Sequence, residues 1–402
     1  MSMTVGIGHG DDVDSINDIK HGGIDAAMDR LGVEQLRARR SVKWSVTSGD
    51  QLGAFIAESD LPLAPTVRDA ITAAVAQGLT GYLPAVVSDE TAAACADFQQ
   101  RRFGWTVDPG HVQLLPDVLG AFAFTIGHLV GPGTPVVLPT PAYMPFLELP
   151  GALGTELRTL PMDQVDGRFV LDPQRLAAAL DGGGLLVLIN PHNPAGQVAT
   201  GDELLAVADV VEATGATVFA DEIHSPLVYP GHQHIPYAAL DERTAAHTVT
   251  AVSASKGWNL PGLACAQLIM TSAEHRRRWS ASPFVVRHGT SPLGAVAASA
   301  AYSVEGVAHL DAVVDYLRRG RDLFADRIAK APSIGYAAPE ATYIHWLDLR
   351  KADIDPGEVA KRTDVLGTNG TACGTAGFLR LTLATSHAVI GEIADRLVGL
   401  VD

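Results

Sequence analysis

The chain has 402 residues, of which 47% are hydrophobic and 18% charged, a composition typical of a soluble globular protein large enough for two domains. Acidic residues outnumber basic ones by 45 to 29, and the formal net charge of −16 argues against nucleic acid as a partner, because phosphate backbones are bound by clustered positive charge. No run approaches the roughly 20 apolar residues of a membrane span, and the first residues lack the features of a signal peptide, so we expect a cytoplasmic protein that binds neither nucleic acid nor membrane.

The first quarter of the chain predicts helices joined by short extended segments. Apolar residues at helical spacing predict a helix over residues 24–40, and an apolar run predicts a short strand over residues 53–57. Two further helices are expected over residues 65–76 and 88–103.

From about residue 110, short and almost wholly apolar runs alternate with helical patterns. Apolar strands separated by helices predict an α/β fold with a mainly parallel sheet covered on both faces. The predicted strands are 111–115, 135–138, 185–189, 217–220, 248–252 and 264–270. The predicted helices include 117–130, 172–180 and 202–214.

The C-terminal part predicts a smaller α/β domain. An Ala-rich helix begins after Pro292, a long helix follows over residues 307–331, and strands are expected over residues 343–349 and 378–383. We therefore expect an N-terminal segment that packs with the small domain (1–66), a large domain (67–295) and a small C-terminal domain (296–402).

Polar side chains follow three of the predicted strands where each strand ends. Asn193 follows strand 185–189, Asp221 follows strand 217–220, and Lys256 follows strand 248–252. Ligands of open α/β sheets bind outside the carboxyl ends of the strands, and a helix beginning at Asp117 offers free backbone N–H groups to a phosphate. Singly, such residues are typical of a turn, a cap and an exposed loop. Together they favour a pyridoxal phosphate (PLP) site.

Other motifs indicate no further chemistry. His232-Gln233-His234 lacks a third ligand at metal spacing and favours a polar loop, so no metal is expected. The three cysteines are widely spaced and odd in number, which predicts no disulfide framework.

Two motifs carry a resemblance to a known family. They are Asn-Pro-His-Asn-Pro-Ala-Gly over residues 190–196 and Asp-Glu-Ile-His over residues 221–224. With them, residues 42–385 resemble a fold-type I PLP-dependent enzyme of the aspartate aminotransferase superfamily. Within it, the chain is most similar to the cystathionine β-lyase (C–S lyase) branch.

The resemblance implies a role for each matching residue. Lys256 would form the Schiff base with PLP and later abstract the substrate Cα proton. Asp221 would pair with the pyridinium nitrogen, Asn193 would hydrogen-bond the ring hydroxyl, and Tyr143 would stack on the ring. Arg380 would bind the substrate α-carboxylate through its planar guanidinium.

The resemblance also implies the phosphate site and the assembly. The phosphate would be held by two backbone amides and two hydroxyl groups, those of Val118, Leu119, Ser253 and Ser255. His224 would belong to the same cofactor pocket. Tyr82 would reach the phosphate from the neighbouring subunit, which implies a homodimer.

Two departures from the family pattern concern this pocket. Asp117 replaces a glycine beside the phosphate amides, where its charge would be unfavourable unless the side chain turns away and caps the helix. Gly257 and Trp258 replace the more usual Thr-Phe after the lysine. These changes leave the cofactor chemistry intact but alter the expected substrate pocket.

The expected function is a PLP-dependent β-lyase that cleaves cystathionine or a related cysteine S-conjugate to a thiol, pyruvate and ammonia. One alternative is an aminotransferase with the same cofactor site. Another is a non-catalytic regulator of the same fold, which the retention of Lys256, Asp221, Asn193 and Arg380 disfavours.

Overall fold

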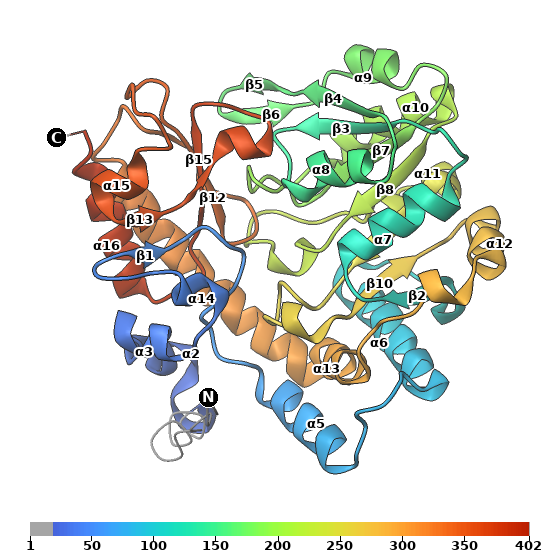
Figure 1. Cartoon of the computed structure of the whole chain (residues 1–402), viewed down its shortest axis with the longest axis horizontal. Helices are drawn as coiled ribbons and strands as arrows, with labels where there is room; N and C mark the ends of the chain where they lie inside the picture. Colours follow the sequence, from blue (N-terminus) through green and yellow to red (C-terminus); the bar gives the residue numbers. More distant parts are fainter. Residues whose placement is uncertain (1–18, 402) are drawn as a thin grey trace, which may run out of the picture.

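The computed structural model describes residues 19–401, and its larger part is built on a seven-stranded sheet (Figure 1). In spatial order the strands are β2 (Val112–Leu115), β10 (Ala266–Ile269), β9 (Thr248–Val252), β8 (Thr217–Asp221), β7 (Leu185–Ile189), β3 (Val136–Thr140) and β4 (Leu157–Pro161). Only β10 runs antiparallel to its neighbours; the pairs from β9 to β4 are parallel. The expected mainly parallel sheet is confirmed.

Helices cover both faces of this sheet because its central strands are apolar on both sides. One face packs against α7 (Val118–Phe124), α8 (Pro145–Ala152) and α12 (Ala273–Ala281). The other face packs against α9 (Pro173–Ala179) and α10 (Gly201–Thr214), with α11 (Glu242–His247) beside α10. The carboxyl ends of β7, β8 and β9 therefore open between two helical layers.

The smaller part holds a four-stranded antiparallel sheet in the order β11 (Gly335–Tyr336), β12 (Ile344–Asp348), β15 (Phe378–Thr382) and β14 (Thr368–Asn369). Helix α16 (His387–Val398) packs along the long helix α14 (Val304–Ile328), which runs from the larger part to the smaller one (Figure 1). The first half of α14 lies in the core beside α5 (Pro65–Ala76), α6 (Ala85–Phe103) and α13 (Pro292–Tyr302), and its second half lies in the core of the small sheet.

The N-terminal segment contacts both cores. Trp44 and Leu52 lie in the core of the small sheet, whereas Met28 and Leu61 lie in the core that contains α5 and α6. Strand β1 (Leu52–Gly53) pairs in parallel with β13 (Val365–Leu366), close to α15 (Val359–Thr363). The division into 1–66, 67–295 and 296–402 stays a proposal; residue 295 falls within α13, and residues 1–18 lie outside the described part.

Two local predictions for the first 60 residues are wrong. The helix expected over residues 24–40 is divided into α2 (Ile19–Asp29) and α3 (Val33–Ala38), because Gly32 is extended (φ −84°, ψ 172°) and starts a new helix. A separate short helix, α4 (Val42–Ser45), follows. The strand expected over residues 53–57 is reduced to β1, because only residues 52 and 53 lie beside a partner strand.

Candidate active site

A cavity of about 230 Å³ lies at the carboxyl ends of β7, β8 and β9. It collects side chains from the turns after these strands, from the start of α7 and from the segment before α8. The predicted site residues that line it are Val118, Leu119, Tyr143, Asn193, Asp221, His224, Ser253, Ser255 and Lys256. The structure thus brings together the acid, the amide and the amine that the sequence placed at separate strand ends.

Lys256 lies in the turn after β9 with its amine inside the cavity. Its Nζ donates to the Ala57 carbonyl at 3.1 Å. Burial, aided by the positive charge of Arg380, lowers the pKa of Lys256 to about 8, while Asp221 acts in the opposite direction. The amine therefore reaches its neutral, nucleophilic form close to physiological pH.

Asp221 is the last residue of β8 and is only 4% exposed. Its Oδ1 accepts from the backbone N–H of Ile223 at 3.2 Å. Burial raises the pKa of Asp221 to about 7, and the hydrogen bond from Ile223 and the charge of Lys256 oppose this shift. A cationic ring nitrogen beside the carboxyl group would restore its ionised form.

The start of α7 is capped by Asp117, as the sequence required. Asp117 Oδ1 accepts from the backbone N–H of Gly120 at 2.6 Å, so the carboxylate is bound to the third residue of the helix. The helix continues into a π-helical turn over Thr125–Leu129. The N–H groups of Val118 and Leu119 precede the capped position at the same helix start.

Ser253 is bound differently from the expectation that it faces a phosphate. Its hydroxyl donates to the Cys265 carbonyl at 2.7 Å and accepts from the N–H of Ser255 at 3.1 Å. Ser253 therefore joins the turn that carries Lys256 to Cys265, the residue before β10. Its phosphate role, like that of Ser255, stays a prediction.

Tyr143 and His224 form part of the apolar wall. The Tyr143 ring contacts Phe146 edge to face at 5.9 Å between centroids, and burial raises its pKa. His224 Nδ1 hydrogen-bonds Thr342 Oγ1 at 2.9 Å, and burial holds the pKa of His224 well below its usual value. His224 is therefore a neutral imidazole in this wall.

Arg380 lies in β15, next to but not lining the cavity. It is 2% exposed, and among the described residues its Nε has no hydrogen-bond partner and its Nη1 has only the Met144 sulfur at 3.6 Å. No ion pair within residues 19–401 includes this guanidinium. A buried positive charge without a partner is costly, so the position is suited to an anionic ligand.

Tyr82, which was predicted to bind the phosphate, and the two residues after the lysine do not line the cavity. Tyr82 is 94% exposed and does not line the cavity of its own chain, so its role towards a neighbouring subunit stays a prediction. Trp258 is buried in the core and donates through Nε1 to the Gly306 carbonyl at 2.8 Å. A side chain at Gly257 would meet Leu310 and Pro226 at 3.2 and 3.3 Å, so both residues after the lysine serve packing.

Sequence reasoning missed the segment that covers the lysine. Ala57 accepts from Lys256, and Asn259 holds Ser59 through two hydrogen bonds: Asn259 Nδ2 donates to the Ser59 carbonyl at 2.7 Å, and the Ser59 N–H donates to Asn259 Oδ1 at 3.0 Å. These partners lie about 200 residues apart in the chain. The one local signal was Asn259 itself, a residue type that tolerates the left-handed conformation it adopts (φ 56°).

The groups in this cavity fit pyridoxal phosphate. A partly buried amine, a buried carboxyl group and the start of a helix match its aldehyde, ring nitrogen and phosphate. The buried Asn193 Oδ1 has no hydrogen-bond partner in the part of the chain that the structure describes, so it is available to a ring hydroxyl. Within residues 19–401 there is no cluster of side chains that could hold a metal ion, and no helix has the length and apolar character to cross a bilayer.

Fold and cavity together define an α/β protein of the fold-type I PLP-dependent class. The chain belongs to the class I and II aminotransferase family, whose pattern it matches over residues 55–397. It is 32% identical over 374 residues to the cystathionine beta-lyase of Corynebacterium glutamicum, covering 92% of this chain and 98% of that protein. It is 30% identical to the cystathionine beta-lyase PatB of Bacillus subtilis, covering 93% and 98%.

A solved structure shows the same relation. The candidate PLP-dependent beta-cystathionase from Corynebacterium diphtheriae superposes with a TM-score of 0.86 and is 32% identical in sequence. The match covers 93% of this chain and 99% of that one. The similarity therefore includes both the large sheet and the small one.

Proposed function

We propose that this protein is a PLP-dependent carbon–sulfur β-lyase that cleaves cystathionine or a related cysteine S-conjugate. The observation that carries the proposal is that one region holds the partly buried amine of Lys256, the buried carboxyl group of Asp221 and the buried guanidinium of Arg380, which pairs with no carboxylate of residues 19–401. The relatives named as cystathionine beta-lyases support the choice of reaction. The products would be a thiol, pyruvate and ammonia.

The residues of the cavity would hold the cofactor and the substrate at different points. Lys256 would bind the cofactor covalently, Asp221 would pair with its ring nitrogen, and Asn193 would donate to or accept from its ring hydroxyl. The phosphate would lie at the start of α7, where Val118 and Leu119 offer backbone N–H groups, with Ser255 nearby. Tyr143 would stack on the ring, and His224 would close the cavity as a neutral side chain.

The chain's own groups account for the proton and charge movements. When bound, PLP supplies an electron sink for the charge that develops at the substrate Cα. Arg380 would bind the α-carboxylate in a charge-assisted pair and so orient the Cα–H bond. Lys256 Nζ, released when the substrate amine takes its place on the cofactor, would take the Cα proton, and the thiolate would leave with the electron pair of the broken C–S bond. Water then converts the remaining fragment to pyruvate and ammonia.

The reaction is tested with purified enzyme and L-cystathionine, with and without a 2-oxo acid. A lyase releases pyruvate and thiol without the acceptor, whereas strict dependence on the 2-oxo acid would identify an aminotransferase instead. Lys256→Ala should reduce turnover by at least the roughly 10²–10⁴-fold contribution of general acid–base catalysis. Lys351→Ala, at an exposed lysine of the small part, is the matched control and should keep full activity.

We further propose a cytoplasmic homodimer in which Tyr82 reaches the phosphate of the neighbouring subunit. The exposure of Tyr82 and its separation from its own cavity support this arrangement. Sedimentation should give a dimer, and Tyr82→Phe should weaken PLP retention without changing the sedimentation coefficient. A fully active monomer would contradict the assembly.

A further inference from the structure

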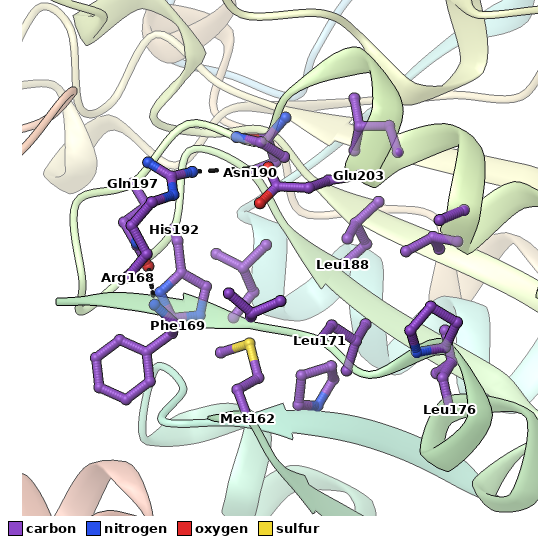
Figure 2. Close-up of a pocket in the computed structure, with 18 of the residues that line it drawn as sticks. Met162, Arg168, Phe169, Leu171, Leu176, Leu188, Asn190, His192, Gln197 and Glu203 are labelled. Carbon is purple, nitrogen blue, oxygen red and sulfur yellow. Dashed lines mark hydrogen bonds and ion pairs between the residues drawn. The ribbon is translucent and has the colours of Figure 1, made fainter. Parts of the chain in front are cut away.

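A second and larger cavity, of about 380 Å³, lies between β7 and the helices α9 and α10 (Figure 2). The hairpin of β5 (Asp163–Val165) and β6 (Arg168–Val170) closes one side. Leu171, Leu176 and Leu188 gather at one end, and Arg168, Gln197 and Glu203 at the other (Figure 2). Voids in packed cores are far smaller, and this volume falls within the range of small-molecule sites.

Two buried amide groups line this cavity with unused donors. Asn190 Oδ1 accepts from the Ala199 N–H at 3.0 Å, and Gln197 Oε1 accepts from the Phe169 N–H at 3.0 Å. These bonds fix which end of each amide is the oxygen. Asn190 is 2% exposed, and neither Asn190 Nδ2 nor Gln197 Nε2 has a partner in the described part of the chain. Buried donors without acceptors are rare and costly, so both are available to an acceptor bound in the cavity.

The charges around the cavity select against an anion. Arg168 is already paired, with Glu340 at its Nη1 and Glu203 at 3.6 Å from its Nη2. Asp202 adds a further carboxylate to the lining. The cavity also contains His192, which is neutral because burial lowers its pKa to about 4. The net charge of the polar end is therefore negative, and a neutral acceptor is favoured over a carboxylate or phosphate.

This cavity is distinct from the candidate active site, although the segment of residues 190–197 borders both. Asn190, His192 and Gln197 face the second cavity, whereas Asn193 faces the first. Internal hydrogen bonds hold the segment: the His192 N–H donates to the Gln197 carbonyl at 2.8 Å, and the Gly196 N–H donates to the His192 carbonyl at 2.7 Å. A molecule bound in the second cavity would contact the wall that carries Asn193.

We propose that this cavity is a second ligand site, for a small neutral molecule with an apolar body and a hydrogen-bond-accepting carbonyl group. The apolar body lies among Leu171, Leu176 and Leu188, and the carbonyl accepts from Asn190 Nδ2 and Gln197 Nε2. The proposal does not depend on the reaction catalysed at Lys256.

The test is calorimetric titration of the PLP-loaded enzyme with 3-phenylpropanamide, a neutral probe with a phenyl group and one carbonyl. Ala206, on α10, lines the cavity, whereas Ala213 on the same helix is exposed. Ala206→Leu fills the space and should abolish binding, and Ala213→Leu should bind like the wild type. Gln197→Glu keeps the acceptor for Phe169 but removes the donor, and should weaken binding roughly five- to tenfold, the factor for one hydrogen bond.

No binding to the wild type at millimolar probe overturns the proposal, as does equal binding to wild type and Ala206→Leu. Circular dichroism confirms that each variant is folded. If Ala206→Leu does not fold, a crystal of the wild-type holoenzyme soaked in the probe decides the matter. Density between β7 and α10 supports the site, and density elsewhere alone overturns it.

Discussion

Replacing Arg380 with methionine should stabilise the fold while it disables the enzyme. Arg380 is buried to 2% exposure, its Nε is unpartnered, and no carboxylate of the described chain pairs with it. Burial accordingly lowers the pKa of Arg380. Exchanging buried charged groups for apolar ones of similar volume is neutral or stabilising by about 1–4 kcal/mol. Two lost charge-assisted hydrogen bonds to a substrate carboxylate, at about 1.5–3 kcal/mol each, predict a roughly 10²–10⁴-fold fall in kcat/KM.

The assay combines urea unfolding of the holoenzyme with steady-state kinetics. Arg350→Met is the matched control, because Arg350 pairs with Asp348 on the same small sheet and its side chain is 55% exposed. The control should lose about 0–1 kcal/mol and keep its kcat/KM. If Arg380→Met loses more than about 1 kcal/mol, the guanidinium has a partner that stabilises it and the reasoning from an unpaired charge is refuted. An unchanged KM and kcat would refute the carboxylate assignment.

Lys43→Met should cost about 3–5 kcal/mol in urea unfolding, because it leaves Asp60 charged and buried where the two now form an ion pair at 2.8 Å. Lys361→Met removes an exposed ion pair and should cost about 0–1 kcal/mol; equal losses would contradict the distinction. Asp117→Ala removes the cap of α7 and should cost about 0.5–2 kcal/mol in the same measurement, with weaker PLP retention by equilibrium dialysis. The raised pKa of Asp221, about 7, means that the folded apoenzyme binds an extra proton between about pH 4 and pH 7. The stability that the protonated Asp221 carboxyl group contributes is therefore lost as the pH rises through that window. The difference in Tm between wild type and Asp221→Asn should change over the same range. A constant difference would show that the carboxyl group titrates normally.

The central strands could be predicted from sequence, and the small peripheral ones could not. β7 is a run of five apolar residues and β9 is rich in β-branched residues, and both are buried, so each stands out against its flanks. β1 and β13 are two residues each and exist only because they lie beside one another, although they are more than 300 residues apart. A pattern of period two cannot appear in two residues. Pairing of that kind depends on tertiary contact alone.

The site divides in the same way. The positions of Lys256, Asp221 and Asn193 were predictable because the strand that precedes each one is readable and parallel strands end at one edge. The capping of α7 by Asp117 was predictable because a phosphate would repel this carboxylate. The favourable local alternative is for the carboxylate to accept a hydrogen bond from an N–H group of the first helical turn. The hydrogen bond from Ser253 to the Cys265 carbonyl was not predictable, because the position of Cys265 depends on how the chain returns to the sheet after the lysine turn.

The covering of the lysine is the part of the site that depends most on long-range structure. Lys43 joins Asp60, and Asn259 binds the backbone one residue earlier, so the segment before α5 is held from two directions. The carbonyl that accepts from Lys256 belongs to Ala57 in that segment. Because Lys43 Nζ also donates to the Ala384 carbonyl at 3.1 Å, the same network binds the end of the small sheet. A substitution at the Lys43–Asp60 ion pair should therefore shift the Lys256 amine through the backbone of this segment, although neither Lys43 nor Asp60 lines the cavity.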